Sequence, residues 1–171
     1  MEAYEAILTR RSVRKYTDKP IDEETMEKLI RAGMYAPSAR NARPWHFITV
    51  QDRATIEKIR KGQPQLAMMR HAPAVIVVCG DPAAVTSQYK DYFIQDCTAA
   101  TENILLAAHA LGLGAVWCGC HPKPDVKAQV AEALGIPPDI VPFSLIAIGY
   151  PDETPKQPDR WEKKKLHREK W

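Results

Sequence analysis

One apolar stretch predicts the centre of this fold: Ala74-Val75-Ile76-Val77-Val78-Cys79. It is a continuous apolar run, rich in β-branched residues, and it is bounded by Pro73 and Gly80. A run of this length and composition predicts a β-strand that is buried on both of its faces. We therefore expect a central sheet that other elements cover on both sides.

Helical and strand patterns alternate along the rest of the chain. Apolar residues at helical spacing, together with helix start and stop signals, predict helices at 3–9, 22–36, 52–61, 88–111 and 124–134. Runs of β-branched and aromatic residues predict three more strands, at 45–50, 115–118 and 142–149. This alternation predicts an α+β or α/β fold with one central sheet.

Length and composition are those of one globular domain. The chain has 171 residues, 45% of them hydrophobic and 26% charged, and its net charge is +3. So small an excess argues against a general nucleic-acid-binding protein. The start shows no signal-peptide pattern, and no apolar run is long enough to span a membrane. We therefore expect a cytoplasmic protein with neither nucleic acid nor membrane as a partner.

Positive charge is concentrated in Thr9-Arg10-Arg11-Ser12-Val13-Arg14-Lys15-Tyr16, which we call the basic stretch. It holds four cations within six residues, with the Ser12 hydroxyl among them. Guanidinium groups bind phosphate oxygens in pairs, and a serine hydroxyl adds another donor. The basic stretch therefore predicts a clamp for a phosphorylated ligand. A solvated basic loop is the alternative, because charge runs are usually solvated.

A second polar segment is Pro37-Ser38-Ala39-Arg40-Asn41-Ala42-Arg43-Pro44, which we call the polar loop. It leads directly into the strand expected at 45–50. Ser38, Asn41 and Arg43 place hydrogen-bond donors and acceptors at the entrance of that strand. The alternative is an ordinary helix-to-strand connection, since Ser and Asn favour turns in any case.

Cys118-Gly119-Cys120-His121 follows the strand expected at 115–118 and raises the question of a metal site. The spacing lacks a second pair of ligands, and a structural zinc site normally has four. We therefore predict no metal. A disulfide scaffold is not expected either, because a chain of this size without secretion rarely needs one.

The composition changes from Asp152 onward. Residues 152–171 show many charges and no core periodicity, yet they contain Trp161, Leu166 and Trp171. Disordered segments are usually poor in aromatic residues. We therefore expect this tail to lie across a surface, such as that of a partner subunit, and to be distinct from a domain at 1–151.

Four segments together resemble the FMN-dependent nitroreductase family. Arg10–Arg14 is similar to its N-terminal flavin-phosphate motif, and Pro37–Phe47 is similar to its P-S-x-x-N-x-Q-P-W-x-F loop. Gly112–Gly119 resembles its late glycine-rich strand, and Ile148–Pro151 resembles the end of its last strand. The four motifs span almost the whole chain in the expected order.

The resemblance implies an α+β three-layer sandwich, with a mixed, mainly antiparallel central sheet flanked by helices. It also implies a homodimer with FMN at the subunit interface. Carried over to this sequence, it implies that the FMN phosphate, ribityl chain and ring edge are bound by Arg10, Arg11, Ser12 and Arg14. It implies that the isoalloxazine is contacted by Pro37, Ser38 and Asn41 of the other subunit and by backbone around Cys118, Gly119 and Cys120. Arg160 would be a second phosphate contact, a role for which Lys156 competes.

Arg43 departs from the family pattern, which usually has Gln at this position. If the loop keeps its geometry, the fixed positive charge would stabilise the anionic reduced flavin. The alternatives are that Arg43 faces solvent or pairs with a carboxylate.

The implied activity is an oxidoreductase. NADH or NADPH would pass hydride to flavin N5 and leave, and a nitroaromatic, quinone or related acceptor would then collect the electrons by a ping-pong mechanism. No side chain need act as nucleophile or general acid, so we name no catalytic residue. Two other functions stay open, a non-redox flavin or nucleotide binder and a specialised family member such as a reductive dehalogenase.

Overall fold

The structure, a computed structural model, describes residues 1–86 and 88–171. Its centre is a four-stranded sheet in the order β1-β2-β4-β3. The strands are β1 (Trp45–Val50), β2 (Ala74–Gly80), β3 (Gly114–Gly119) and β4 (Val141–Gly149). All three strand pairs are antiparallel, and Ser12 adds a single parallel bridge to Ala115 of β3.

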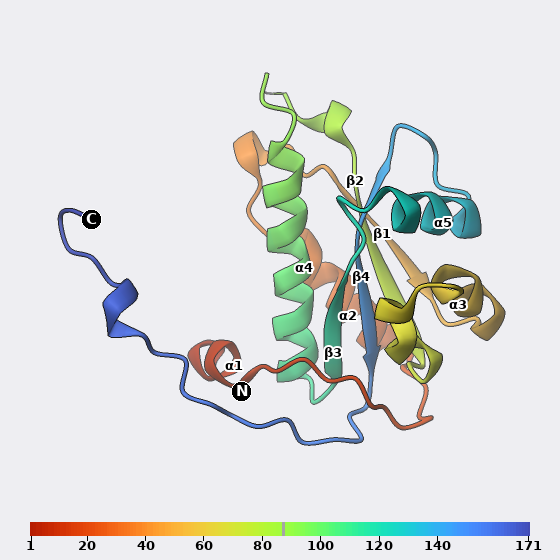
Figure 1. Cartoon of the computed structure of the whole chain (residues 1–171), viewed down its shortest axis with the longest axis horizontal. Coiled ribbons are helices and arrows are strands. Elements are labelled where there is room, and N and C mark those ends of the chain that lie inside the picture. The colour runs from red at the N-terminus through yellow and green to blue at the C-terminus, as the bar shows by residue number, and fades with distance from the viewer. Residues whose placement is uncertain (87) are drawn as a thin grey trace.

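Helices cover both faces of this sheet (Figure 1). α2 (Glu23–Met34) and α4 (Tyr92–Ala110) pack on one face, while α3 (Arg53–Arg60) and α5 (Pro124–Leu134) pack on the other. α1 (Ala3–Thr9) packs against α4. The predicted α+β three-layer sandwich is therefore confirmed. No helix within the described residues is long and apolar enough to cross a membrane.

Within residues 1–86 and 88–171, three connections and the tail add four 3₁₀ helices, none of which the sequence patterns predicted. They are η1 (Ala39–Asn41), η2 (Pro64–Arg70), η3 (Pro82–Ala84) and η4 (Lys163–Lys165). η2 contributes to the core, since Leu66 and Met69 are fully buried.

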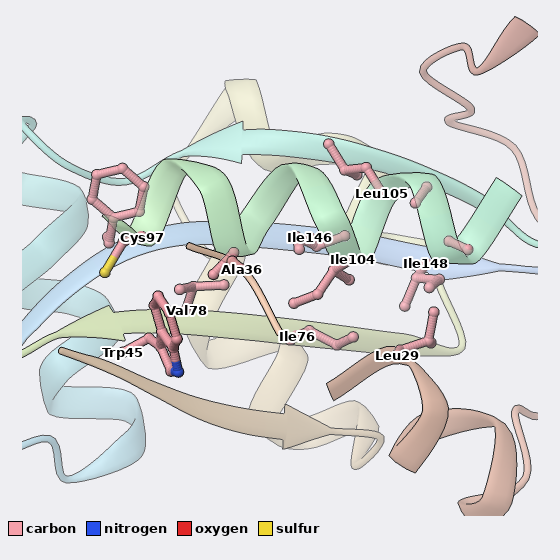
Figure 2. Packing of buried hydrophobic residues seen from close by; sticks show 14 of the residues in the cluster. Leu29, Ala36, Trp45, Ile76, Val78, Cys97, Ile104, Leu105, Ile146 and Ile148 are labelled. Atoms are coloured by element: carbon pink, nitrogen blue, oxygen red, sulfur yellow. The ribbon is translucent and has the colours of Figure 1, made fainter. Parts of the chain in front are cut away.

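β2 is the buried centre of the molecule, as its apolar run predicts. All seven of its residues are buried. Alternate side chains of a strand point to opposite faces. Ile76 therefore packs with Leu29 of α2 and Ile104 of α4, as Figure 2 shows, while Val77 packs with Ile59 of α3 on the other side.

α4 is the long helix that the sequence predicts, but it begins at Tyr92 rather than at residue 88. Most of its predicted apolar line is buried, including Cys97 and Ile104, but Leu111, just after the helix ends, is exposed. Residues 88–91 are exposed, and they are three polar residues and one tyrosine. They have no apolar face to bury, so they stay in turns, and the predicted start of the helix at residue 88 was wrong for this reason.

Gln129 joins the two helices that cover the second face. Its Nε2 lies 3.0, 2.9 and 2.8 Å from the carbonyl oxygens of Lys58, Ile59 and Lys61. These carbonyls are at the end of α3, where they have no partner within the helix. We expect Gln129→Leu to lower the free energy of unfolding by about 1–3 kcal/mol, because it leaves them unsatisfied.

Chemical denaturation of the two proteins measures this difference. Gln95→Leu is the matched control, since Gln95 is exposed on α4 and its replacement should change stability by less than about 0.5 kcal/mol. Equal effects of the two substitutions would contradict the bracing role of Gln129.

Candidate functional site

The basic stretch and the polar loop lie at opposite ends of the sheet. Ser12 bridges Ala115 at the start of β3, in register with the first residue of β2. The polar loop runs into Trp45, which pairs with Gly80 at the other end of β2. The seven residues of β2 span about 20 Å between these ends. A site that uses both segments therefore needs a ligand of about this length or residues from two chains.

The basic stretch is held against β3 by its own backbone and by one close contact. Val13 N donates to Ala115 O at 3.0 Å, and the Val13 side chain is buried. A Cβ at Gly114 would lie only 2.6 Å from Val13 Cγ1. Glycine at 114 therefore allows Val13 to reach the sheet.

Tyr16 fixes the other end of the basic stretch. Its hydroxyl donates to the carbonyl oxygens of Val13, at 2.5 Å, and Ala147, at 3.0 Å. Burial raises the pKa of the Tyr16 hydroxyl well above its usual value, so the group stays protonated and keeps its donor proton. Core contacts thus hold both ends of the segment from Val13 to Tyr16.

The three arginines of the basic stretch have different partners. Arg10 Nε lies 3.2 Å from Glu102 Oε1. Arg11 donates to the carbonyl oxygens of Leu8, at 2.9 Å, and Arg10, at 2.7 Å, where α1 ends. It also reaches two carbonyl oxygens of the tail at 3.3 and 3.4 Å. The Arg14 side chain is exposed. Arg11 therefore ties the tail to α1, and Arg14 has its guanidinium at the surface.

A carboxylate already occupies part of the basic stretch. The backbone N–H groups of Arg14 and Lys15 donate to Glu153 Oε1 at 2.6 and 3.2 Å. Asp152 N donates to Lys15 O at 2.9 Å, which holds this turn of the tail in place. The backbone of the basic stretch thus binds an anion of its own chain. Sequence reasoning missed Glu153, because nothing in the pattern links it to residues 139 positions away.

The polar loop has an unusual backbone. Arg40, Asn41 and Arg43 have φ values of 53°, 56° and 46°. A left-handed conformation costs a residue other than glycine about 1–2 kcal/mol. Several such residues persist together only where the surroundings hold them, and this kind of strain clusters at functional sites.

Hydrogen bonds within the polar loop define its shape. Ser38 Oγ accepts from Arg43 N at 3.0 Å, and Ser38 O accepts from Asn41 N at 3.1 Å. Pro37, Asn41 and Arg43 are exposed, and Ser38 is partly exposed. The side chains of Asn41 and Arg43 are therefore presented on the surface, while the Ser38 hydroxyl is engaged within the loop.

Two bonds fix the polar loop on the body of the protein. Pro44 O accepts from Asp81 N at 2.7 Å. Ala39 N donates to Asp96 Oδ1 of α4 at 2.9 Å. Asp96 is a second residue that sequence reasoning missed. The available signal was a carboxylate within the otherwise apolar face of a long helix.

The end of β3 and the residue after it present their backbone and not their thiols. Cys118 and Cys120 are buried, which raises the pKa of these thiols to about 11 and about 12. Gly119, between them, is partly exposed, and a Cβ there would meet no atom within 4 Å. This arrangement suits the expected backbone contact with a ligand.

The tail runs away from the body of the molecule (Figure 1). Trp161, Leu166 and Trp171 are all exposed, Trp161 by 68%. Arg160 lines a groove of about 660 Å³ together with Arg11 and α1. The tail thus carries apolar side chains that this chain alone does not bury.

The sequence matches the family model for Nitroreductase over residues 7–66 and 60–150. This chain belongs to the nitroreductase family. It is 45% identical over 171 residues to a Methanothermobacter thermautotrophicus protein provisionally named NADH dehydrogenase/NAD(P)H nitroreductase, a match that covers 100% of this chain and 88% of that protein. It is 30% identical to FMN reductase [NAD(P)H] of Bacillus subtilis, covering 92% of this chain and 69% of the relative.

A solved structure of the family agrees closely in fold. A provisionally named nitroreductase of a Desulfovibrio desulfuricans subspecies, in complex with FMN, superimposes with a TM-score of 0.85 and is 32% identical. The match covers 100% of this nitroreductase-family chain and 98% of the other. The resemblance inferred from four sequence motifs is therefore confirmed at the level of family and fold.

Proposed function

We propose that this nitroreductase-family protein is an FMN-dependent oxidoreductase. It would use NADH or NADPH as the donor and a nitroaromatic, quinone or related small molecule as the acceptor, by a ping-pong mechanism. FMN, when bound, supplies the hydride and electron transfer. The observation that carries the proposal is that one chain with the nitroreductase fold has both a basic stretch that binds an anion and a strained, exposed polar loop.

The residues of this chain fit such a cofactor. Ser12, Arg10 and Arg14 would hold the phosphate at the edge of β3. The exposed backbone at Gly119 leaves open space beside the opposite end of the same strand. Arg11 would act through the geometry of α1 and the tail, because carbonyl oxygens engage its guanidinium. The remaining contacts would come from Pro37, Ser38, Asn41 and Arg43 of a second chain, from backbone at Cys118 and Cys120, and from Arg160.

A homodimer with the cofactor at its interface explains the apolar surface. Tyr4, Ile7 and Leu8 of α1 are more than half exposed, and they line the groove that also contains Trp161. Exposed apolar clusters of this kind mark interaction sites. The domain at 1–151 would supply the sandwich, and the tail at 152–171 would pack across the partner subunit. Sedimentation velocity should give a dimer, and a shorter chain ending at residue 151 should dissociate.

The decisive test is optical. The purified protein should be yellow, and NADH or NADPH added without air should bleach it. A subsequent acceptor should restore the colour. A protein that binds flavin but keeps its colour with both nicotinamides would be a non-redox binder. A colourless protein that ignores added FMN in calorimetry would overturn the proposal. Cytoplasmic location is part of the same proposal and is checked by fractionation of the host cell.

Arg43 should tune the bound cofactor. Reduction adds negative charge to a flavin, and a nearby guanidinium stabilises that charge. We expect Arg43→Gln to lower the reduction potential by about 20–40 mV in a two-electron titration. Arg31→Gln, an exposed site on α2, should leave the potential unchanged. Equal potentials for wild type and Arg43→Gln would show that Arg43 faces solvent in the dimer.

A further inference from the structure

Asp96 lies in the buried face of α4, directly under the polar loop. It is only 4% exposed. Its neighbours along the helix, Phe93, Cys97 and Ala100, are buried core residues. One carboxylate oxygen, Oδ1, accepts the Ala39 N–H at 2.9 Å. The other, Oδ2, is buried and has no hydrogen-bond partner among the described residues.

This arrangement is unfavourable for the core taken alone. A buried polar atom without a partner carries a desolvation penalty, and such atoms are rare in native structures. An apolar residue would serve the packing of α4 better. The carboxylate therefore has a use outside core stability, and the contact it makes points to the polar loop.

The loop needs such an anchor. The bonds of Ser38 to Arg43 N and Asn41 N close the loop on itself, so they define its shape but not its position. The Pro44–Asp81 bond holds the far end of the loop, so its three left-handed residues favour relaxation of the rest once the attachment of Ala39 is lost. The Ala39–Asp96 bond attaches the first residue of η1 to a rigid helix 57 positions away in the sequence.

We propose that Asp96 is a positioning residue for cofactor binding. Its carboxylate holds the strained polar loop on α4, so that Ser38 and Asn41 are already in place when the flavin arrives. Preorganisation of this kind raises affinity by removing the cost of ordering a loop. The proposal rests on the proposed FMN function and adds to it a residue that need not touch the cofactor.

Two substitutions and one control test this role. Asp96→Ala removes the acceptor, whereas Asp96→Asn keeps a carbonyl oxygen at the same place. Thr101→Val is the control, because Thr101 is fully buried on the same helix and bonds Ser144 Oγ at 2.8 Å, away from the loop. Flavin-free protein is titrated with FMN and with riboflavin, and amide hydrogen exchange is followed in the peptide 37–45.

We expect Asp96→Ala to weaken the binding of FMN and of riboflavin alike, by about tenfold to a hundredfold, as loss of a hydrogen bond to a charged group implies. The binding of both flavins should weaken, because the polar loop is proposed to contact the isoalloxazine ring and not the phosphate. Exchange in 37–45 should accelerate, while the unfolding temperature should change little. Asp96→Asn should restore affinity and protection, and Thr101→Val should lower stability with normal flavin affinity.

Other results would overturn the role of Asp96. One is an Asp96→Ala protein with wild-type affinity for both flavins. Another is a loss of flavin affinity in Asp96→Ala that is no larger than its loss of stability explains and that Thr101→Val also shows. A wild-type protein that binds neither flavin would instead overturn the proposed function, and with it this role.

Discussion

Replacing Arg10 and Arg14 together by Gln will give a colourless protein whose affinity for added FMN is lower by a factor of at least about 100. Hydrogen bonds between a guanidinium and a phosphate are charge-assisted, and each contributes about 1.5–3 kcal/mol. Two such contacts exceed the factor of 100, since every 1.4 kcal/mol is about tenfold in affinity. The Arg14 side chain is exposed, and Arg10 pairs with the partly exposed Glu102 and not with a buried carboxylate, so the fold should survive.

Riboflavin provides the internal control for this double variant. It lacks the phosphate, so its weaker binding should be nearly the same in wild type and variant. Arg31→Gln removes one positive charge from an exposed site on α2 and should leave FMN binding intact. If the double variant lost FMN and riboflavin in equal measure, the arginines would be holding the site's structure and not the phosphate.

Gly149→Ala should give the largest loss of stability among single methyl additions. A Cβ at this last residue of β4 would lie 2.5 Å from Pro73 Cδ, 2.7 Å from Pro73 Cγ and 3.0 Å from Tyr16 Cβ. A proline ring and a Cβ cannot rotate away, so the backbone must move. We expect a loss of about 3 kcal/mol, which lowers the unfolding temperature of a chain of this size by about 6–12 °C.

Differential scanning calorimetry of flavin-free protein measures this shift, since bound flavin would stabilise the folded state by mass action. Gly119→Ala is the stability control, because a Cβ there would meet no atom within 4 Å. Its unfolding temperature should be unchanged or slightly higher. A Gly149→Ala protein as stable as Gly119→Ala would show that the contact between β4 and Pro73 is softer than its distances indicate.

Tyr16 connects Gly149 to the basic stretch. Its Cβ lies beside Gly149, and its hydroxyl holds Val13 and Ala147. A displacement at Gly149 should therefore move the basic stretch as well as the core. Gly149→Ala should bind FMN more weakly even at temperatures where it is fully folded.

Much of the fold was predictable because its signals are local. The apolar run of β2, the Asp22 N-cap that accepts from Thr25 N, and the strand at Trp45–Val50 each depend on a few consecutive residues. The start of α4 was placed too early, since helix ends depend on which residues find a core to pack against. The 3₁₀ helix η2 was missed for the same reason, since the burial of Leu66 and Met69 depends on the folded core.

The candidate site divides in the same way. The layers of the sandwich and the two polar segments could be predicted from the sequence, because hydrophobic period, charge density and turn residues can be read along the chain. Three contacts became evident in the folded chain: carbonyl oxygens of the tail engage Arg11, Glu153 binds the basic stretch, and Asp96 anchors the polar loop. Those contacts join residues that are far apart in the sequence and meet only in the folded chain, so no local sequence pattern predicts them.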